Sequence, residues 1–134
     1  MASPGCVLRV SGVNLDPDDV LRRTSLQAVS VWNNGDKRAD RVCAGSGFVL
    51  NISNRALLDQ QIEDSIQFIN ARRLALQSLR NAPAIDDIRL DFGIALREAA
   101  VQSNTFPSLL VRLAGEFDIA LELSQYPPDD ILSP

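Results

Sequence analysis

Residues 55–80 read RALLDQQIEDSIQFINARRLALQSLR, the longest stretch of the chain with one clear period. When it is wound at about 100° per residue, its large apolar side chains fall within one broad arc. Acidic residues gather in its first half and Arg72, Arg73 and Arg80 in its second half. This is the order that the helix dipole favours. The stretch therefore predicts one long amphipathic helix, which ends before Pro83.

Alternating apolar and polar residues lie on both sides of this helix. Residues 48–52 and residues 88–96 each direct one apolar set to one face, which predicts strands with one face on a core and the other near water. Ser53 or Asn54 follows the first of these strands, and either side chain could cap the helix.

The beginning of the chain predicts a strand and then a short helix. Residues 6–10 alternate and are followed by a glycine, as expected for a half-buried strand. Asp16 suits the N-cap position and Pro17 the first helical position, so we expect a helix over residues 17–23.

The next segment contains a turn signal. Residues 28–32 predict a strand, and Asn34-Gly35 after it predicts a reverse turn. Residues 37–44 fit either the return arm of a hairpin or an open loop.

The end of the chain predicts a third helix and a closing strand. Pro107 opens the helix, in which Leu109, Leu110, Leu113 and Phe117 share a face, and residues 119–123 form the strand. We expect the tail, residues 129–134, to be frayed.

These elements follow the order strand, helix, strand, strand, helix, strand, helix, strand. The first six have the ferredoxin-like order, in which helices cover one face of an antiparallel sheet. The predicted fold is a two-layer α+β domain with a mainly antiparallel sheet and helices packed on one face. A length of 134 residues suits a single domain over residues 1–134, with an ordered core over residues 6–127.

Composition narrows the classes of partner. The net charge of −4 argues against a general electrostatic grip on nucleic acid or on an anionic membrane. The chain shows no secretory signal and no apolar run long enough to cross a bilayer, so we expect a cytoplasmic protein.

Reactive groups are sparse. The chain has no histidine, which removes the usual general base and the commonest metal ligand. Cys6 and Cys43 are isolated thiols, and we expect Cys6 to be buried in a strand. We therefore predict no catalytic residue, no cofactor and no metal site. The alternative is a small enzyme that uses carboxylates or a divalent metal ion.

Three segments together resemble a known domain family. They are FPSLLVRLAGEFDIALELSQYPP at residues 106–128, Val31-Trp32 to Gly35-Asp36 after a short helix, and GSGFVL before a long helix. This pattern resembles an uncharacterised bacterial family, domain of unknown function 4279, over residues 7–128. The family often has a tryptophan where this chain has Phe48. The resemblance implies a compact bacterial α+β domain, with no activity or catalytic residue to transfer. Such small domains often serve as immunity proteins beside secreted toxins, which is an argument by analogy.

Trp32 is the only tryptophan, and it precedes a polar loop. Its ring could close the end of the core, or it could anchor a partner, because aromatic and arginine residues dominate binding hot spots. Arg72 could likewise pack its stem and extend its head into solvent, or contact a partner together with Arg73. The predicted partner-binding residues are Trp32, Asn33, Asn34, Asp36, Lys37, Arg38, Arg72 and Arg73.

The predicted function is a non-catalytic protein-binding module that presents acidic loops and the Trp32 turn to a protein partner. It would act as an immunity or regulatory protein, with a toxin encoded nearby as one such partner. A homodimer joined through an edge strand or the exposed sheet face is a further alternative.

Overall fold

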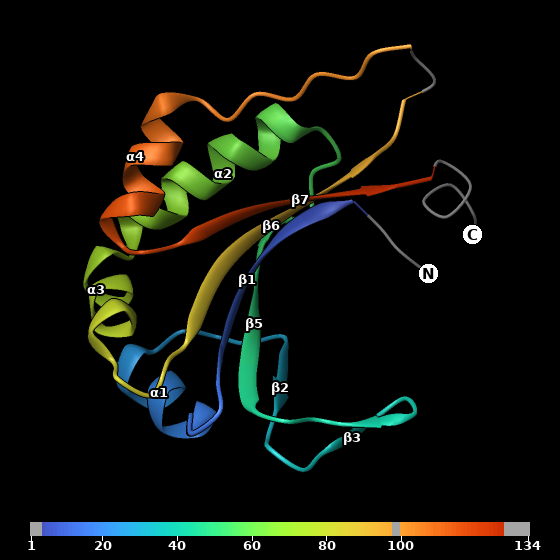
Figure 1. Cartoon of the computed structure of the whole chain (residues 1–134). Coiled ribbons are helices and arrows are strands. Elements are labelled where there is room, and N and C mark those ends of the chain that lie inside the picture. The colour runs from blue at the N-terminus through green and yellow to red at the C-terminus, as the bar shows by residue number, and fades with distance from the viewer. Residues whose placement is uncertain (1–3, 98–99, 128–134) are drawn as a thin grey trace.

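The computed structural model describes residues 4–97 and 100–127, so the predicted frayed tail lies outside the described residues. The strands are β1 (Gly5–Gly12), β2 (Ser30–Trp32), β3 (Lys37–Arg38), β4 (Arg41–Val42), β5 (Ser46–Ser53), β6 (Asp87–Ala95) and β7 (Ala120–Tyr126). The helices are α1 (Pro17–Thr24), α2 (Leu58–Ala71), α3 (Arg73–Asn81) and α4 (Ser108–Glu116). They lie on one face of a twisted sheet, which confirms the predicted two-layer α+β fold (Figure 1).

The main sheet has five strands in the order β2-β5-β1-β6-β7. The pairs β2–β5, β5–β1 and β1–β6 are antiparallel, the arrangement of a ferredoxin-like sheet. β7 then pairs with β6 in parallel. A parallel neighbour needs a crossover, and α4 lies in the connection from β6 to β7.

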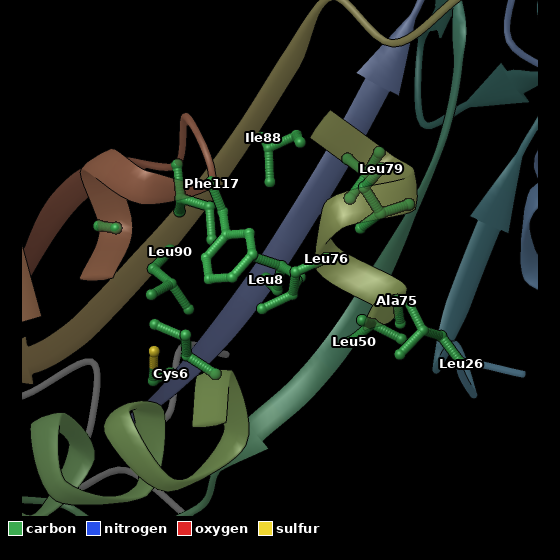
Figure 2. Packing of buried hydrophobic residues seen from close by; sticks show 14 of the residues in the cluster. Cys6, Leu8, Leu26, Leu50, Ala75, Leu76, Leu79, Ile88, Leu90 and Phe117 are labelled. Carbon is green, nitrogen blue, oxygen red and sulfur yellow. The ribbon is translucent and has the colours of Figure 1, made fainter. Parts of the chain in front are cut away.

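The core lies between the sheet and the helices. In β1 the alternate residues Cys6, Leu8 and Val10 are fully buried on the helix side. Phe117, next to the end of α4, lies among leucines from β1, β6 and α3 (Figure 2). The alternation in the sequence thus marks which strand face the helices cover.

The predicted helix over residues 17–23 is confirmed as α1. Asp16 has an extended backbone, and its Oδ1 accepts a hydrogen bond from Asp19 N at 3.4 Å. Pro17 takes the first position of the helix, as predicted.

The prediction of one long helix over residues 55–80 is wrong, because two helices meet at Arg72. The backbone of Arg72 leaves the helical region at φ −123° and ψ 34°. Its side chain donates from Nη2 to Thr24 O at 3.0 Å, at the end of α1. The change of direction lets Ala75, Leu76 and Leu79 of α3 pack into the core.

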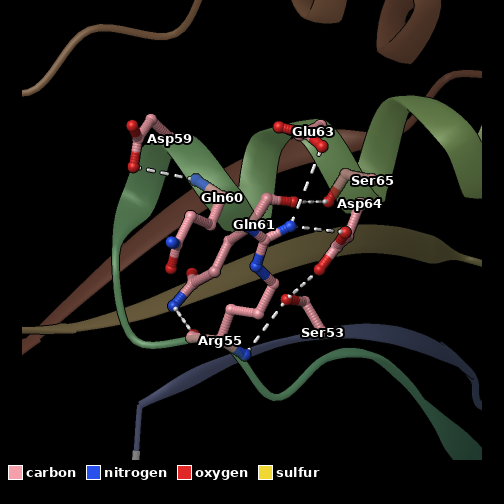
Figure 3. A network of polar contacts seen from close by, with 8 residues as sticks. All are labelled: Ser53, Arg55, Asp59, Gln60, Gln61, Glu63, Asp64 and Ser65. Carbon is pink, nitrogen blue, oxygen red and sulfur yellow. Dashed lines mark hydrogen bonds and ion pairs between the residues drawn. The ribbon is translucent and has the colours of Figure 1, made fainter.

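The predicted N-cap of the long helix is also wrong. Leu57 is the N-cap of α2 and makes no side-chain capping bond. Ser53 instead ends β5, and its Oγ donates to Asp64 Oδ2 at 2.6 Å. Buried Gln61 joins the same region, donating from Nε2 to Arg55 O and Gly93 O, each at 2.9 Å (Figure 3 shows the bond to Arg55). These bonds tie α2 to β5 and β6.

Residues 37–44 form neither the return arm of a hairpin around Asn34-Gly35 nor an open loop. β3 and β4 pair with each other as a small separate hairpin, with Lys37 opposite Val42. This hairpin extends from the start of β5 on the side of the sheet away from the helices (Figure 1). It therefore forms a wall beside the open face of the sheet.

The closing part of the chain agrees with prediction except for one side chain. Leu110, Leu113 and Phe117 are buried, but Leu109 is 42% exposed. None of the helices in the described part of the chain has the length and apolar character needed to span a membrane.

Candidate functional site

Trp32 lies on the open face of the sheet. It pairs with Gly47 of β5, while the preceding pair, Val31 and Phe48, belongs to the helix side. A Cβ atom at Gly47 would overlap the Trp32 ring and Val10 O, so glycine is what leaves room for the indole beside β5. Trp32 therefore packs on the strand backbone and does not fill the helix-covered core.

The turn after Trp32 is held by its own polar groups. Asn33 N donates to Asp36 Oδ2 at 2.7 Å, and Asn34 N donates to Ser46 Oγ at 2.9 Å. Gly35 has a φ of 93°, a backbone conformation that favours glycine. The turn thus has a defined shape, and it positions the hairpin that follows.

Arg38 covers Trp32. Its guanidinium carbon lies 5.2 Å from the centroid of the indole, a cation–π arrangement. Arg38 Nη2 donates to Ser30 Oγ at 3.1 Å and to Val31 O at 3.0 Å. A guanidinium carries N–H donors on three nitrogens, and those on Nε and Nη1 have no partner among the described residues. Arg38 is therefore held in place while its Nε and Nη1 N–H groups remain free to bind a partner.

A groove of about 660 Å³ lies between the open face of the sheet and the β3–β4 hairpin. β1, β2 and β5 supply its floor, and the hairpin supplies one wall. Its lining includes one aromatic ring, one thiol and four charged side chains, namely Trp32, Cys43, Arg9, Arg38, Arg41 and Asp86.

The groove is basic although the chain is acidic. Asp86 Oδ2 is engaged by Val13 N at 2.9 Å. Arg9 forms long ion pairs with Asp91 and Glu122, each 3.8 Å from its Nη1, a separation too great for a hydrogen bond. Arg41 is exposed and makes no ion pair within the described residues. The lining beside Trp32 is therefore mainly basic, because Arg9 of β1 meets Arg38 and Arg41 of the β3–β4 hairpin there.

The two predicted site residues on the long helix lie elsewhere. Arg72 is bound to α1, as described above. Arg73 forms a bidentate pair with Glu116 at 3.0 and 2.8 Å, and its guanidinium lies 5.4 Å from the centre of the Phe117 ring. Both belong to the helix layer, on the opposite side of the sheet from Trp32. The structure brings together Trp32 to Arg38 and leaves Arg72 and Arg73 apart.

Three charged residues that line the groove, Arg9, Arg41 and Asp86, were not among the predicted site residues. Arg9 stands at an outward position of β1, which is a weak signal that could have placed it on the open face. Arg41 lies beyond the hairpin turn, and Asp86 precedes β6. Arg41 is close in sequence to Arg38, whereas no local pattern links Arg9 or Asp86 to the hairpin, because they meet it only through strand pairing.

The two thiols differ in environment. Cys43 lines the groove and is partly exposed. Cys6 is fully buried, and burial raises its pKa to about 12, although a hydrogen bond with Ser65 opposes this shift. Within residues 4–97 and 100–127, no three His, Cys, Asp or Glu side chains are grouped so that they could hold a metal ion.

Comparisons of the chain with protein-family models, with curated proteins and with solved structures found no match. The resemblance to domain of unknown function 4279 therefore stays a prediction.

Proposed function

We propose that this protein is a non-catalytic protein-binding module whose groove beside Trp32 binds an acidic segment of a partner protein. The observation that carries this proposal is a groove lined by Arg9, Arg38, Arg41 and the Trp32 indole in a chain of net charge −4. Arginine recognises carboxylates through paired N–H donors, so acidic side chains are the natural complement.

The fixed geometry of Trp32 and Arg38 supports a recognition role. Aromatic and arginine side chains dominate the binding energy of protein interfaces. Here the stacked pair is already ordered by Ser30, Val31 and Gly47. Binding would therefore cost little side-chain entropy.

The charges around the groove favour an acidic peptide segment over nucleic acid. Asp87, Asp91 and Glu122 lie on the same open face, next to the groove. These carboxylates confine the positive charge to the groove, whereas nucleic acid needs positive charge along an extended surface.

The biological form of this proposal is an immunity or regulatory protein that covers part of its partner. Two free cysteines suit a reducing compartment, which supports a cytoplasmic location. If the partner is a toxin encoded beside this protein, co-expression should yield a stable complex that Arg41→Glu weakens.

The groove can be tested directly because Trp32 is the only tryptophan. A peptide of alternating glutamate and valine should change the Trp32 emission and slow the reaction of Cys43 with a thiol reagent. We expect Arg41→Glu to weaken this binding by about tenfold or more, since it reverses a charge at the contact. Added salt should weaken it as well.

A matched control uses Arg112, an exposed arginine of α4 with no ion pair among the described residues. Arg112→Glu makes the same change of net charge in the helix layer, and it should leave peptide binding unchanged. Equal binding of a lysine–valine peptide, or equal weakening by Arg112→Glu, would show that the groove does not select acidic segments.

A further inference from the structure

A second, smaller hollow lies on the open face of the sheet, at the other end of the strands that form the groove floor. Its volume is about 270 Å³, and its lining includes Asn51, Asp91 and Tyr126. We refer to it as the Asp91 hollow. Arg9 lines both the groove and this hollow, so the two adjoin at its side chain. Together they form one path across the open face.

The strand register gives the length of this path. Ser11 pairs with Gly47 at the groove, whereas Val7 pairs with both Asn51 and Asp91 at the hollow. Ser11 and Val7 are four residues apart along β1, which corresponds to roughly 13 Å at the rise of a β-strand. An extended peptide segment therefore covers this distance with about four of its own residues.

The hollow carries a carboxylate where the groove carries guanidinium groups. Asp91 Oδ1 accepts a hydrogen bond from Ser124 Oγ at 2.6 Å, and its Oδ2 makes no hydrogen bond among the described residues. The Asp91 side chain is 12% exposed, and its one ion pair within the described residues is the 3.8 Å contact with Arg9. Glu122, the other acid beside Arg9, also pairs with Arg89 at 3.2 Å. Asp91 is thus the acid that depends on Arg9 alone.

An acidic segment in the groove would change the charge balance around Asp91. A carboxylate bound to Arg9 competes with Asp91 for the guanidinium, and a largely buried carboxylate that loses its cation is costly. A lysine of the same segment would replace that cation. Asn51 lies at the same level of the sheet and offers an amide oxygen, and the Tyr126 ring offers apolar surface to the lysine stem.

We propose that the segment bound by this protein carries a lysine about four residues from its acidic side chains, and that the ammonium group of this lysine binds Asp91. This inference rests on the proposed function of the groove. It adds to the recognised motif a second charge, of opposite sign and at a defined distance from the first.

The test compares peptides that contain Glu-Val-Glu in a serine background. One peptide has no lysine, one has a lysine directly beside a glutamate, and two have it four residues away, before or after the acidic part. Trp32 emission gives the dissociation constant of each. We expect one of the two spaced peptides to bind about fivefold more tightly than the peptide of equal composition with adjacent charges.

The role of Asp91 is tested by matched variants. Asp91→Asn keeps an acceptor for Ser124 Oγ and should remove the preference for the spaced lysine, while the peptide without lysine still binds. Glu122→Gln makes the same change of charge beside Arg9 but outside the hollow, and it should retain the preference. Asn51 is exposed, so Asn51→Asp should fold even if Asp91→Asn does not, and it should increase the preference.

Equal binding of the spaced and adjacent peptides, in a protein that binds the peptide without lysine, would overturn this inference and leave the proposed function intact. A preference that persists in Asp91→Asn, or that Asn51→Asp does not increase, would overturn it as well. Failure of every acidic peptide to bind would overturn both this inference and the proposed function.

Discussion

The Cys6 thiol faces the core from the first strand, and its surroundings set its chemistry. Its side chain has no exposed surface, and its Sγ lies 3.5 Å from Ser65 Oγ. Burial penalises the thiolate and raises the pKa of Cys6 to about 12, from 9.0. Cys6 is therefore unreactive in the folded chain, in contrast to Cys43 in the groove.

This shift predicts a loss of stability at alkaline pH. Above pH 9.0 the unfolded thiol releases its proton while the folded thiol keeps it, so the free energy of unfolding falls until the pH reaches about 12. The loss should be on the order of 1 kcal/mol per pH unit within this window. Urea unfolding at several pH values should show a steeper decline for the native chain than for Cys6→Ala. Equal slopes would contradict a buried, neutral thiol.

The ends of the helices show which helix boundaries can be predicted from neighbouring residues and which cannot. The Asp16-Pro17 pair begins α1 as expected, because a cap needs only a few neighbouring residues. Ser53, a predicted cap of the helix, bonds Asp64 inside α2 instead, and Arg72 at the break bonds Thr24 of α1. Apolar periodicity continues through the break, so it cannot reveal a change in direction.

The cap of α1 can be measured by one substitution. Asp16→Ala removes the acceptor for Asp19 N, and we expect the free energy of unfolding to fall by about 1 kcal/mol. Asp18→Ala is the control, because Asp18 is an exposed first-turn acid with only a dipole contribution of about 0.3–1 kcal/mol. Chemical denaturation of both variants gives the comparison. An equal effect at both positions would argue against the side-chain cap.

At the scale of the whole molecule, the two faces of the main sheet have different roles. Its helix-covered face contains the core, and its open face carries an ion-pair row in which Arg89 lies between Asp87 at 2.7 Å and Glu122 at 3.2 Å. Exposed pairs of this kind contribute little to stability. Packing on the helix side therefore maintains the fold, which leaves the open face free for recognition.

This division predicts a gradient of local stability. β1 has hydrogen-bonded neighbours on both sides, whereas β3 and β4 pair only with each other. Amide hydrogens of β1 should exchange most slowly, near the global unfolding rate, and those of β3 and β4 should exchange fastest. Hydrogen exchange followed by mass spectrometry would measure this order. Strong protection of the hairpin in the free protein would contradict it.

Much of the architecture follows from local patterns in the chain. Alternation in β1 and β6, the cap before α1 and the turn at Asn34-Gly35 each depend on nearby residues, so they and the two-layer class could be predicted. The burial of Gln61 and Ser65 could not be predicted, since polar side chains are tolerated inside the protein only through hydrogen bonds that form on folding.

The groove could likewise be predicted only in part from the sequence. Trp32, Arg38 and Arg41 are close in sequence, but Arg9 joins them only when strand pairing brings β1 beside β5. The spacing of apolar residues shows which side of a helix or strand is buried. It does not show which other helix or strand will pack against that element, because this is decided only when the chain folds.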